Sequence, residues 1–161
     1  MLYHHIAAKM GHAYVTKLCI ETVTNYKNIS GVTPIFEAAK YGSLEIYKIM
    51  TGNLENKNSS CNQENCTPLH MAAGQGYLEI CKVIIENVWN KNPGNRDGNT
   101  PLHIAAYKGH LNIYKQIFEN IQDRNPGNIA GDTPLHLAAV QGYLEICKVI
   151  IENVQNKNPG N

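Results

Sequence analysis

The chain has 161 residues, 43% of them hydrophobic, which is enough to bury a continuous core. Fourteen lysines and arginines nearly balance 13 aspartates and glutamates, so the formal net charge of +1 predicts no long-range attraction to nucleic acid or to an anionic membrane. No apolar run approaches the roughly 18 to 20 residues of a membrane span, and the first residues lack the basic start and apolar core of a secretion signal. We therefore expect a cytoplasmic, intracellular protein.

The first predicted elements are two helices within residues 1 to about 29. The segment His5-Ile-Ala-Ala-Lys-Met-Gly-His12 matches His103-Ile-Ala-Ala-Tyr-Lys-Gly-His110 later in the chain. The apolar residues that follow, between Ala13 and Tyr26, have helical spacing. A Thr-Pro pair that opens the later copies is absent here, so we interpret this segment as a degenerate first repeat that caps the array.

From residue 31 onward the same unit returns at an almost constant interval. Its opening Thr-Pro pair begins at Thr33, Thr67, Thr100 and Thr133, in steps of 34, 33 and 33 residues. A period of about 20 to 50 residues is typical of stacked arrays. We expect one domain over residues 1–161, with repeats at about 1–30, 31–64, 65–97, 98–130 and 131–161.

Each unit predicts two short helices, as the fourth copy illustrates. Thr100 is suited to cap the first helix, with proline at the first helical position. Gly109 ends this helix because glycine adopts the left-handed conformation without penalty. A second helix follows over residues 111–119 and ends near Asn120, the other residue type that tolerates this conformation. Neither helix reaches the roughly 12 to 15 residues that an isolated helix needs, so each depends on stacking.

A turn-rich finger, meaning the segment between a second helix and the next threonine, completes the unit. In the fourth copy it contains Asn125-Pro-Gly-Asn128. The finger after the second repeat is one residue longer and has Ser59-Ser-Cys61 in place of Pro-Gly, so we expect a local bulge there.

The period, the Thr-Pro-Leu-His-x-Ala-Ala motif and the following Gly-His-Leu or Gly-Tyr-Leu together resemble the ankyrin repeat. The resemblance covers nearly the whole chain. It implies an all-α solenoid of stacked antiparallel helix pairs with projecting β-hairpin-like fingers, and a concave face lined by fingers and first helices. One departure is systematic: asparagine replaces the glycine that usually follows the second helix. We therefore expect asparagine to cap these helices, at Asn53, Asn87, Asn120 and Asn153.

Three histidines invite a metal or acid–base interpretation. His70, His103 and His136 recur once per repeat at a helix start, and stacking separates them by about 10 Å, the distance between packed helices. They cannot share a metal at ligand lengths of about 2 Å. In the ankyrin family this histidine is structural and links the threonine cap to backbone groups. We interpret the cluster of His4, His5 and His12 as surface positions, and we expect no metal site.

The five cysteines are expected to be free thiols. Cys19, Cys81 and Cys147 fall in second helices, where a small hydrophobic residue packs. Cys61 and Cys66 share one finger and are able to pair under oxidation, but an odd total favours a reducing compartment. No Gly-rich phosphate loop, nucleophile–base pair or paired-carboxylate site occurs. We therefore expect neither a cofactor nor catalysis.

With no candidate for catalysis or cofactor binding, the sequence favours a surface that binds a partner. In the ankyrin family the partner usually contacts the finger tips and the two residues between Ala-Ala and glycine. These positions differ between the copies here while the framework is constant, which fits a row of tunable contacts and equally fits unselected drift. Tyr107 and Arg96, flanked by Tyr41 and Lys108, supply the aromatic and arginine anchors of many interfaces. The predicted protein-binding residues are Lys40, Tyr41, Gln63, Glu64, Gln75, Arg96, Asp97, Asn99, Tyr107, Lys108, Asp132 and Gln141.

Two apolar features remain. Trp89, the only tryptophan, has two interpretations: an exposed anchor, or a side chain packed under a neighbouring finger, which we favour. The last second helix is as apolar as an internal one, so we expect an apolar end face. Either the chain is a fragment of a longer array, or the arrays associate end to end.

We therefore expect a protein–protein interaction module, a scaffold or adaptor that binds a protein partner through its concave face. We expect no enzyme activity, no nucleic-acid partner and no membrane insertion. Two other hypotheses stay open: a recruitment segment of a larger enzyme or channel, and a host-directed effector from a symbiont or parasite.

Overall fold

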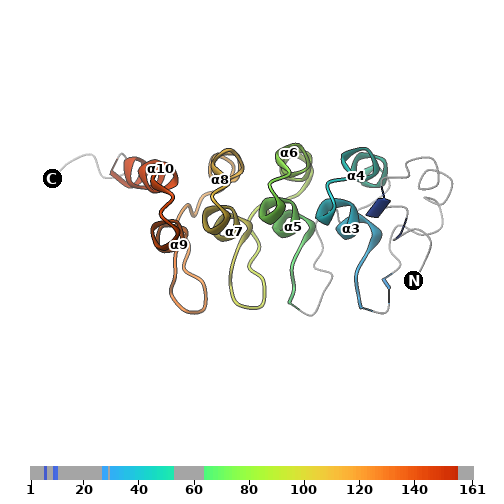
Figure 1. Cartoon of the computed structure of the whole chain (residues 1–161), viewed down its shortest axis with the longest axis horizontal. Helices are drawn as coiled ribbons and strands as arrows, with labels where there is room; N and C mark the ends of the chain where they lie inside the picture. The colour runs from blue at the N-terminus through green and yellow to red at the C-terminus, as the bar shows by residue number, and fades with distance from the viewer. Residues whose placement is uncertain (1–5, 7–8, 11–26, 29, 53–63, 156–161) are drawn as a thin grey trace.

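The computed structural model describes residues 6, 9–10, 27–28, 30–52 and 64–155. Within these residues the secondary structure is entirely helical, and the main elements are four helix pairs stacked side by side (Figure 1). The pairs are α3 (Pro34–Lys40) with α4 (Leu44–Thr51), α5 (Pro68–Gln75) with α6 (Leu78–Asn87), α7 (Pro101–Lys108) with α8 (Leu111–Phe118), and α9 (Pro134–Gln141) with α10 (Leu144–Gln155).

The helices form two rows, with the fingers below them. First helices α3, α5, α7 and α9 make the middle row, and second helices α4, α6, α8 and α10 make the upper row (Figure 1). Each first helix packs on the next first helix and on its own partner. The predicted all-α solenoid is confirmed. Its assignment as one array over residues 1–161 stays a prediction.

The predicted start of the first helices is confirmed. Thr100 has an extended backbone, and its hydroxyl accepts from the backbone N–H of His103 at 3.5 Å. Thr133 makes the same bond to His136. The cap leaves the first turn with one fewer unpaired donor, and the proline that follows has no N–H to satisfy.

The predicted glycine end of the first helices is confirmed for α5, α7 and α9, whereas Tyr41 caps α3 and Gly42 follows it. Gly109 is left-handed, with a φ of 75°. The ring of Tyr143, from the next repeat, lies directly over it, where a Cβ would collide. Tyr77 covers Gly42 in the same way, with a Cβ placed 2.7 Å from the ring. Glycine at this position therefore allows the left-handed turn after the helix and also leaves room for the tyrosine ring of the next repeat.

The expectation that a left-handed asparagine caps each second helix was wrong: Val88 caps α6, Glu119 caps α8, and α10 continues past Asn153 to Gln155. Asn120 is not left-handed; among the described non-glycine residues only Asn65 has a positive φ. Instead, the Asn120 side chain donates from Nδ2 to the Gln116 carbonyl at 2.8 Å. Asn87 and Asn153 bond the carbonyl four residues back in the same way. A side-chain amide therefore bonds a carbonyl near the end of the helix without the strain of a left-handed backbone.

The Asn-Pro-Gly-Asn fingers use both of their asparagines. In the third finger the Asn92 side chain accepts from the N–H of Leu102 at 3.1 Å, so it caps the following helix. Asn95 accepts from two amides at the finger tip, those of Asp97 and Asn99. Successive fingers are joined by backbone bonds, such as Arg96 N–H to the Glu64 carbonyl at 2.8 Å. These bonds explain why the fingers keep one register along the stack.

The core lies between the two helix rows. The paired alanines of α3, α5 and α7 are fully buried, because their small side chains let neighbouring helices approach closely. One position of the second helices alternates large and small side chains along the stack: Tyr47, Cys81 and Tyr114 are fully buried, and Cys147 is half-buried. The predicted free thiols of Cys81 and Cys147 are confirmed, and the side chain of Cys66 is also buried.

The last repeat has an open apolar end, as predicted. Val140 of α9 is 81% exposed. Leu144 of α10 is 62% exposed, whereas Leu78 and Leu111 at the equivalent positions are partly buried against the core.

Among the described residues, no helix has both the length and the apolar character that a bilayer crossing requires. Several predictions fall on residues outside the described part: the first-repeat helices, the finger bulge at 59–61, Gln63, Asn53, His4, His5, His12, Cys19 and Cys61.

Candidate protein-binding site

Buried histidines tie each repeat to the next. His70 Nδ1 accepts from the backbone N–H of Thr67 at 3.1 Å and lies 2.8 Å from the Thr67 hydroxyl. Its Nε2 lies 2.9 Å from the carbonyl oxygen of Asn99, in the next repeat. Because a carbonyl only accepts, Nε2 carries the proton and Nδ1 is the acceptor. His103 repeats this arrangement with Thr100 and Asp132, so the structural role expected from the resemblance is confirmed.

Burial keeps these imidazoles neutral. It lowers the pKa of His70 to about 4, and it also lowers the pKa of His103. The described residues contain no group of three metal-ligating side chains. The histidines therefore have a structural role: they hold neighbouring repeats together. The candidate binding site lies on the exposed surface that these repeats form.

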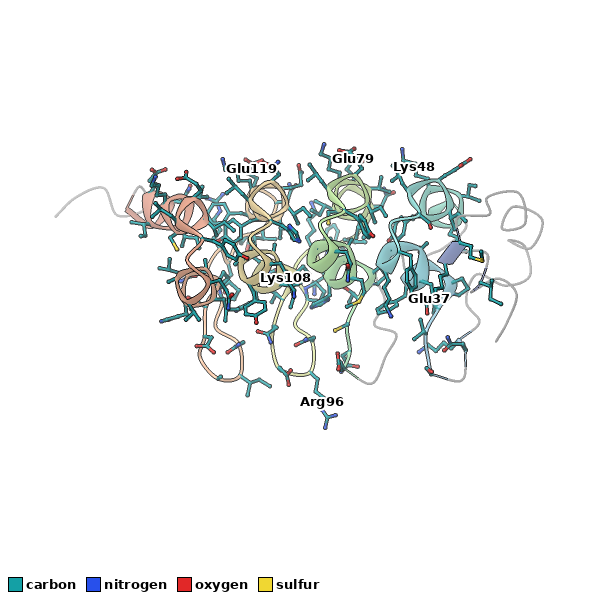
Figure 2. The ribbon with its side chains drawn as sticks, viewed as in Figure 1. Glu37, Lys48, Glu79, Arg96, Lys108 and Glu119 are labelled. Carbon is teal, nitrogen blue, oxygen red and sulfur yellow. The ribbon has the colours of Figure 1, made fainter. Side chains whose placement is uncertain are left out.

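That surface is the inner face, which we define as the ends of the first helices, residues 40–41, 74–75, 107–108 and 140–141, together with finger residues 64, 96, 97, 99 and 132. Figure 2 shows Lys108 on α7, near the level where the fingers begin, and Arg96 at a finger tip, pointing away from the helices. The inner face therefore extends from the row of first helices to the tips of the fingers.

Two tyrosines stand on the helix part of the inner face. Tyr41 is 39% exposed and Tyr107 is 44% exposed. Lysine ammonium groups lie over their rings: Lys9 and Lys40 at 4.9 and 5.4 Å from the centroid of Tyr41, and Lys108 at 5.4 Å from that of Tyr107. At these distances the ammonium is attracted to the ring, which favours a defined ring position at the surface.

The other predicted contacts divide into exposed side chains and frame residues. Glu64, Gln75, Asp97 and Gln141 are exposed, as predicted contacts should be. Asn99 and Asp132 are half-buried, and each gives its backbone carbonyl to a histidine of the preceding repeat. The Asn99 side chain also accepts from Asn128 at 2.9 Å. These two residues therefore have a framework role in addition to any contact.

A pocket at Gly74 is a feature that the predicted residues did not include. It has a volume of about 190 Å³ and lies between α5 and α7, where Met71, Gly74 and Gln75 face Ile104 and Lys108. The sequence contains the signal. Equivalent positions carry Lys40, Tyr107 and Val140, so glycine removes a side chain from this place alone.

The preferred interpretation of Trp89 was wrong. It is 102% exposed rather than packed under a finger, and it lines a wide cleft of about 750 Å³ between the segments 86–92 and 120–126. The equivalent residues are Gln122 and Gln155, and a polar type at this position indicated solvent contact.

Comparison with known proteins agrees with this architecture. Residues 53–128 and 89–161 each match the family model for ankyrin repeats in three copies, and together they cover more than half of the chain. A search among curated proteins gives no match. Ankyrin repeats are generally protein–protein interaction modules and are typically non-catalytic. The chain belongs to the ankyrin-repeat family.

Proposed function

We propose that this chain binds a protein partner along its inner face, as an adaptor or scaffold with no catalytic activity of its own. The observation that carries the proposal is the pair of exposed tyrosines, Tyr41 and Tyr107. A lysine ammonium group lies over each ring, and hydrogen bonds between repeats hold the helices that carry them. Aromatic residues held in place at a surface dominate the energetics of many interfaces.

The frame supports this function because it is pre-organised. His and Asn side chains bond one repeat to the next, as in the contact of His103 with the Asp132 carbonyl at 3.0 Å and that of Asn128 with Asn99 at 2.9 Å. The predicted contacts Gln75, Tyr107 and Lys108 project from this frame with exposed side chains. A rigid surface loses little conformational entropy when it binds, so more of the contact energy appears as affinity.

The proposed setting is the reducing interior of a cell, and the proposed partner is a protein rather than nucleic acid. The free thiols of Cys81 and Cys147 are compatible with that compartment. The near-zero net charge favours a protein partner over a polyanion.

Affinity capture from a cytosolic lysate tests the proposal with three proteins: the intact chain, Tyr107→Ala combined with Arg96→Ala, and Trp89→Gln. Trp89→Gln is a matched control, because it removes a fully exposed aromatic residue outside the inner face and installs the residue of the equivalent positions. Circular dichroism and melting should be the same for all three.

The proposal predicts a partner that the intact chain and Trp89→Gln retain and that the double variant loses. A partner lost from Trp89→Gln but retained by the double variant would move the binding site to the cleft of Trp89. Capture of the same proteins by all three would contradict the proposal that the inner face binds the partner.

A further inference from the structure

The pocket at Gly74 interrupts the inner face at its middle. It has a volume of about 190 Å³, and its walls are mostly apolar: Met71 and the backbone of Gly74 on α5, Ile104 on α7, and the buried Cys66. Gln75 and Lys108 stand at its polar side. A cavity with apolar walls and a few polar groups is the usual form of a binding pocket.

Glycine is the cause of the pocket. Gly74 lies within the last turn of α5 and has no positive φ, so the helix does not require glycine there. Glycine within a helix is about 1 kcal/mol less favourable than alanine. A Cβ at this position would lie 3.2 Å from Cγ2 of Ile104, which is closer than an ordinary van der Waals contact, so any side chain here would push against the Ile104 wall of the pocket.

The volume fits one side chain. An apolar cavity of about 150 Å³ is large enough to hold benzene. A pocket of about 190 Å³ therefore accommodates a leucine, isoleucine, methionine or phenylalanine side chain, but not a drug-sized ligand, which needs about 300 Å³ or more. Met71 has three rotatable bonds, which allows the wall to adjust to the shape of the entering group.

The positive charge of Lys108 beside the pocket favours an acidic residue next to the apolar side chain that enters it. Lys108 is exposed at the pocket wall, and no carboxylate of the described residues forms an ion pair with it. The helix part of the inner face also carries Lys40, and Lys9 lies beside it over the Tyr41 ring, whereas Glu64 and Asp97 stand on the fingers. A carboxylate next to the apolar group would meet lysine here without meeting a described acidic residue of the same helices.

We propose that the pocket at Gly74 receives one apolar side chain of a partner segment, and that a carboxylate adjacent to it in that segment pairs with Lys108. The partner class is therefore a peptide or loop with an aliphatic or aromatic residue beside Asp or Glu. This inference rests on the proposed function, because it places the partner on the inner face.

In the test, a displayed library of random dodecapeptides is selected for binding to the intact chain. The most enriched peptide is then synthesised, and its affinity for four variants is measured. Gly74→Val fills the pocket with the residue of the equivalent position 140, and Lys108→Gln installs the residue of positions 75 and 141. Tyr107→Ala reports on the inner face as a whole, and Trp89→Gln is the remote control. If Gly74→Val fails to fold, Gly74→Ala replaces it, since alanine favours the helix and still narrows the pocket.

The inference predicts a pool that shares Leu, Ile, Met or Phe next to Asp or Glu. Affinity should fall about tenfold to a hundredfold in Gly74→Val, the equivalent of leaving one such side chain unburied. It should fall about twofold to fivefold in Lys108→Gln, as for an exposed ion pair. Trp89→Gln should bind as the intact chain does.

Two results would overturn the inference: a pool without the paired acidic and apolar residues, or a peptide that binds Gly74→Val as tightly as the intact chain. The response to Tyr107→Ala then separates the two proposals. If that variant loses the peptide, the inner face still binds proteins and only the pocket assignment fails. If it does not, both proposals fail.

Discussion

The Nε2 atom of His70 donates to the carbonyl oxygen of Asn99, 2.9 Å away and 29 residues later in the chain. The same imidazole accepts from the N–H of Thr67, so one side chain joins the cap of its own helix to the finger of the next repeat. The inner face keeps its shape because such bonds recur between repeats, and His103 forms the next one with Asp132.

This bond makes stability depend on pH. His70 is 1% exposed, and burial lowers its pKa from 6.5 to about 4. Between these values the unfolded chain takes up a proton that the folded chain does not, so the folded state loses stability as pH falls from about 6.5 to about 4 and no more below that. We expect a loss of about 3 kcal/mol from this residue, measured by urea unfolding over this range.

The matched variant is His70→Phe, because Phe36 stands at the equivalent position of the second repeat. It should be less stable than the intact chain at pH 7, and the gap should narrow toward pH 4. A gap that stays constant over this range would show that His70 does not remain neutral in the folded state.

The contact of Gly109 with Tyr143 predicts a second effect on stability. Gly109→Ala adds a Cβ at a φ of 75° and drives it into the Tyr143 ring. We expect a loss of about 2 to 4 kcal/mol, from the left-handed backbone together with overpacking. Gly142→Ala is the control, because Gly142 has a φ of 77° and no atom within 4 Å of its Cβ position. If both variants lose the same free energy, the stacked ring contributes nothing.

Tyr114 offers a stabilising change. Its ring is fully buried in α8 beside Phe118, and its hydroxyl has no hydrogen-bond partner. Tyr114→Phe removes an unsatisfied buried group, which costs about 1 to 3 kcal/mol, so chemical denaturation should show a gain of about 1 kcal/mol. Tyr143→Phe, at a partly exposed ring, should change little. A loss of stability in Tyr114→Phe would mean that the hydroxyl is bonded in the folded protein.

The sequence was enough to predict the framework. Threonine, proline and glycine act through local backbone rules, so Thr100 and Gly109 marked the helix ends correctly. A period of 33 residues then required stacking. The end of the second helices was harder, because asparagine has two ways to cap a helix. Asn120 uses its side chain, and that choice depends on geometry that residue type does not reveal.

The site was less predictable than the frame. Exposed positions such as Tyr107 and Gln75 followed from the repeat register. The pocket did not, because its volume depends on how closely Ile104 of the next helix approaches Gly74. Trp89 was misjudged because its large apolar surface suggested burial, although the stack leaves the loops after α6 and α8 open to solvent.

The central claim is that the inner face is the recognition surface, and amide chemical-shift mapping with an enriched peptide tests it most directly. The isotopically labelled intact chain is titrated and every amide is followed. The account predicts the largest shifts at residues 74–75 and 107–108, with smaller ones along the neighbouring fingers. Shifts confined to 86–92 and 120–126 would place recognition at the cleft of Trp89 and contradict the account.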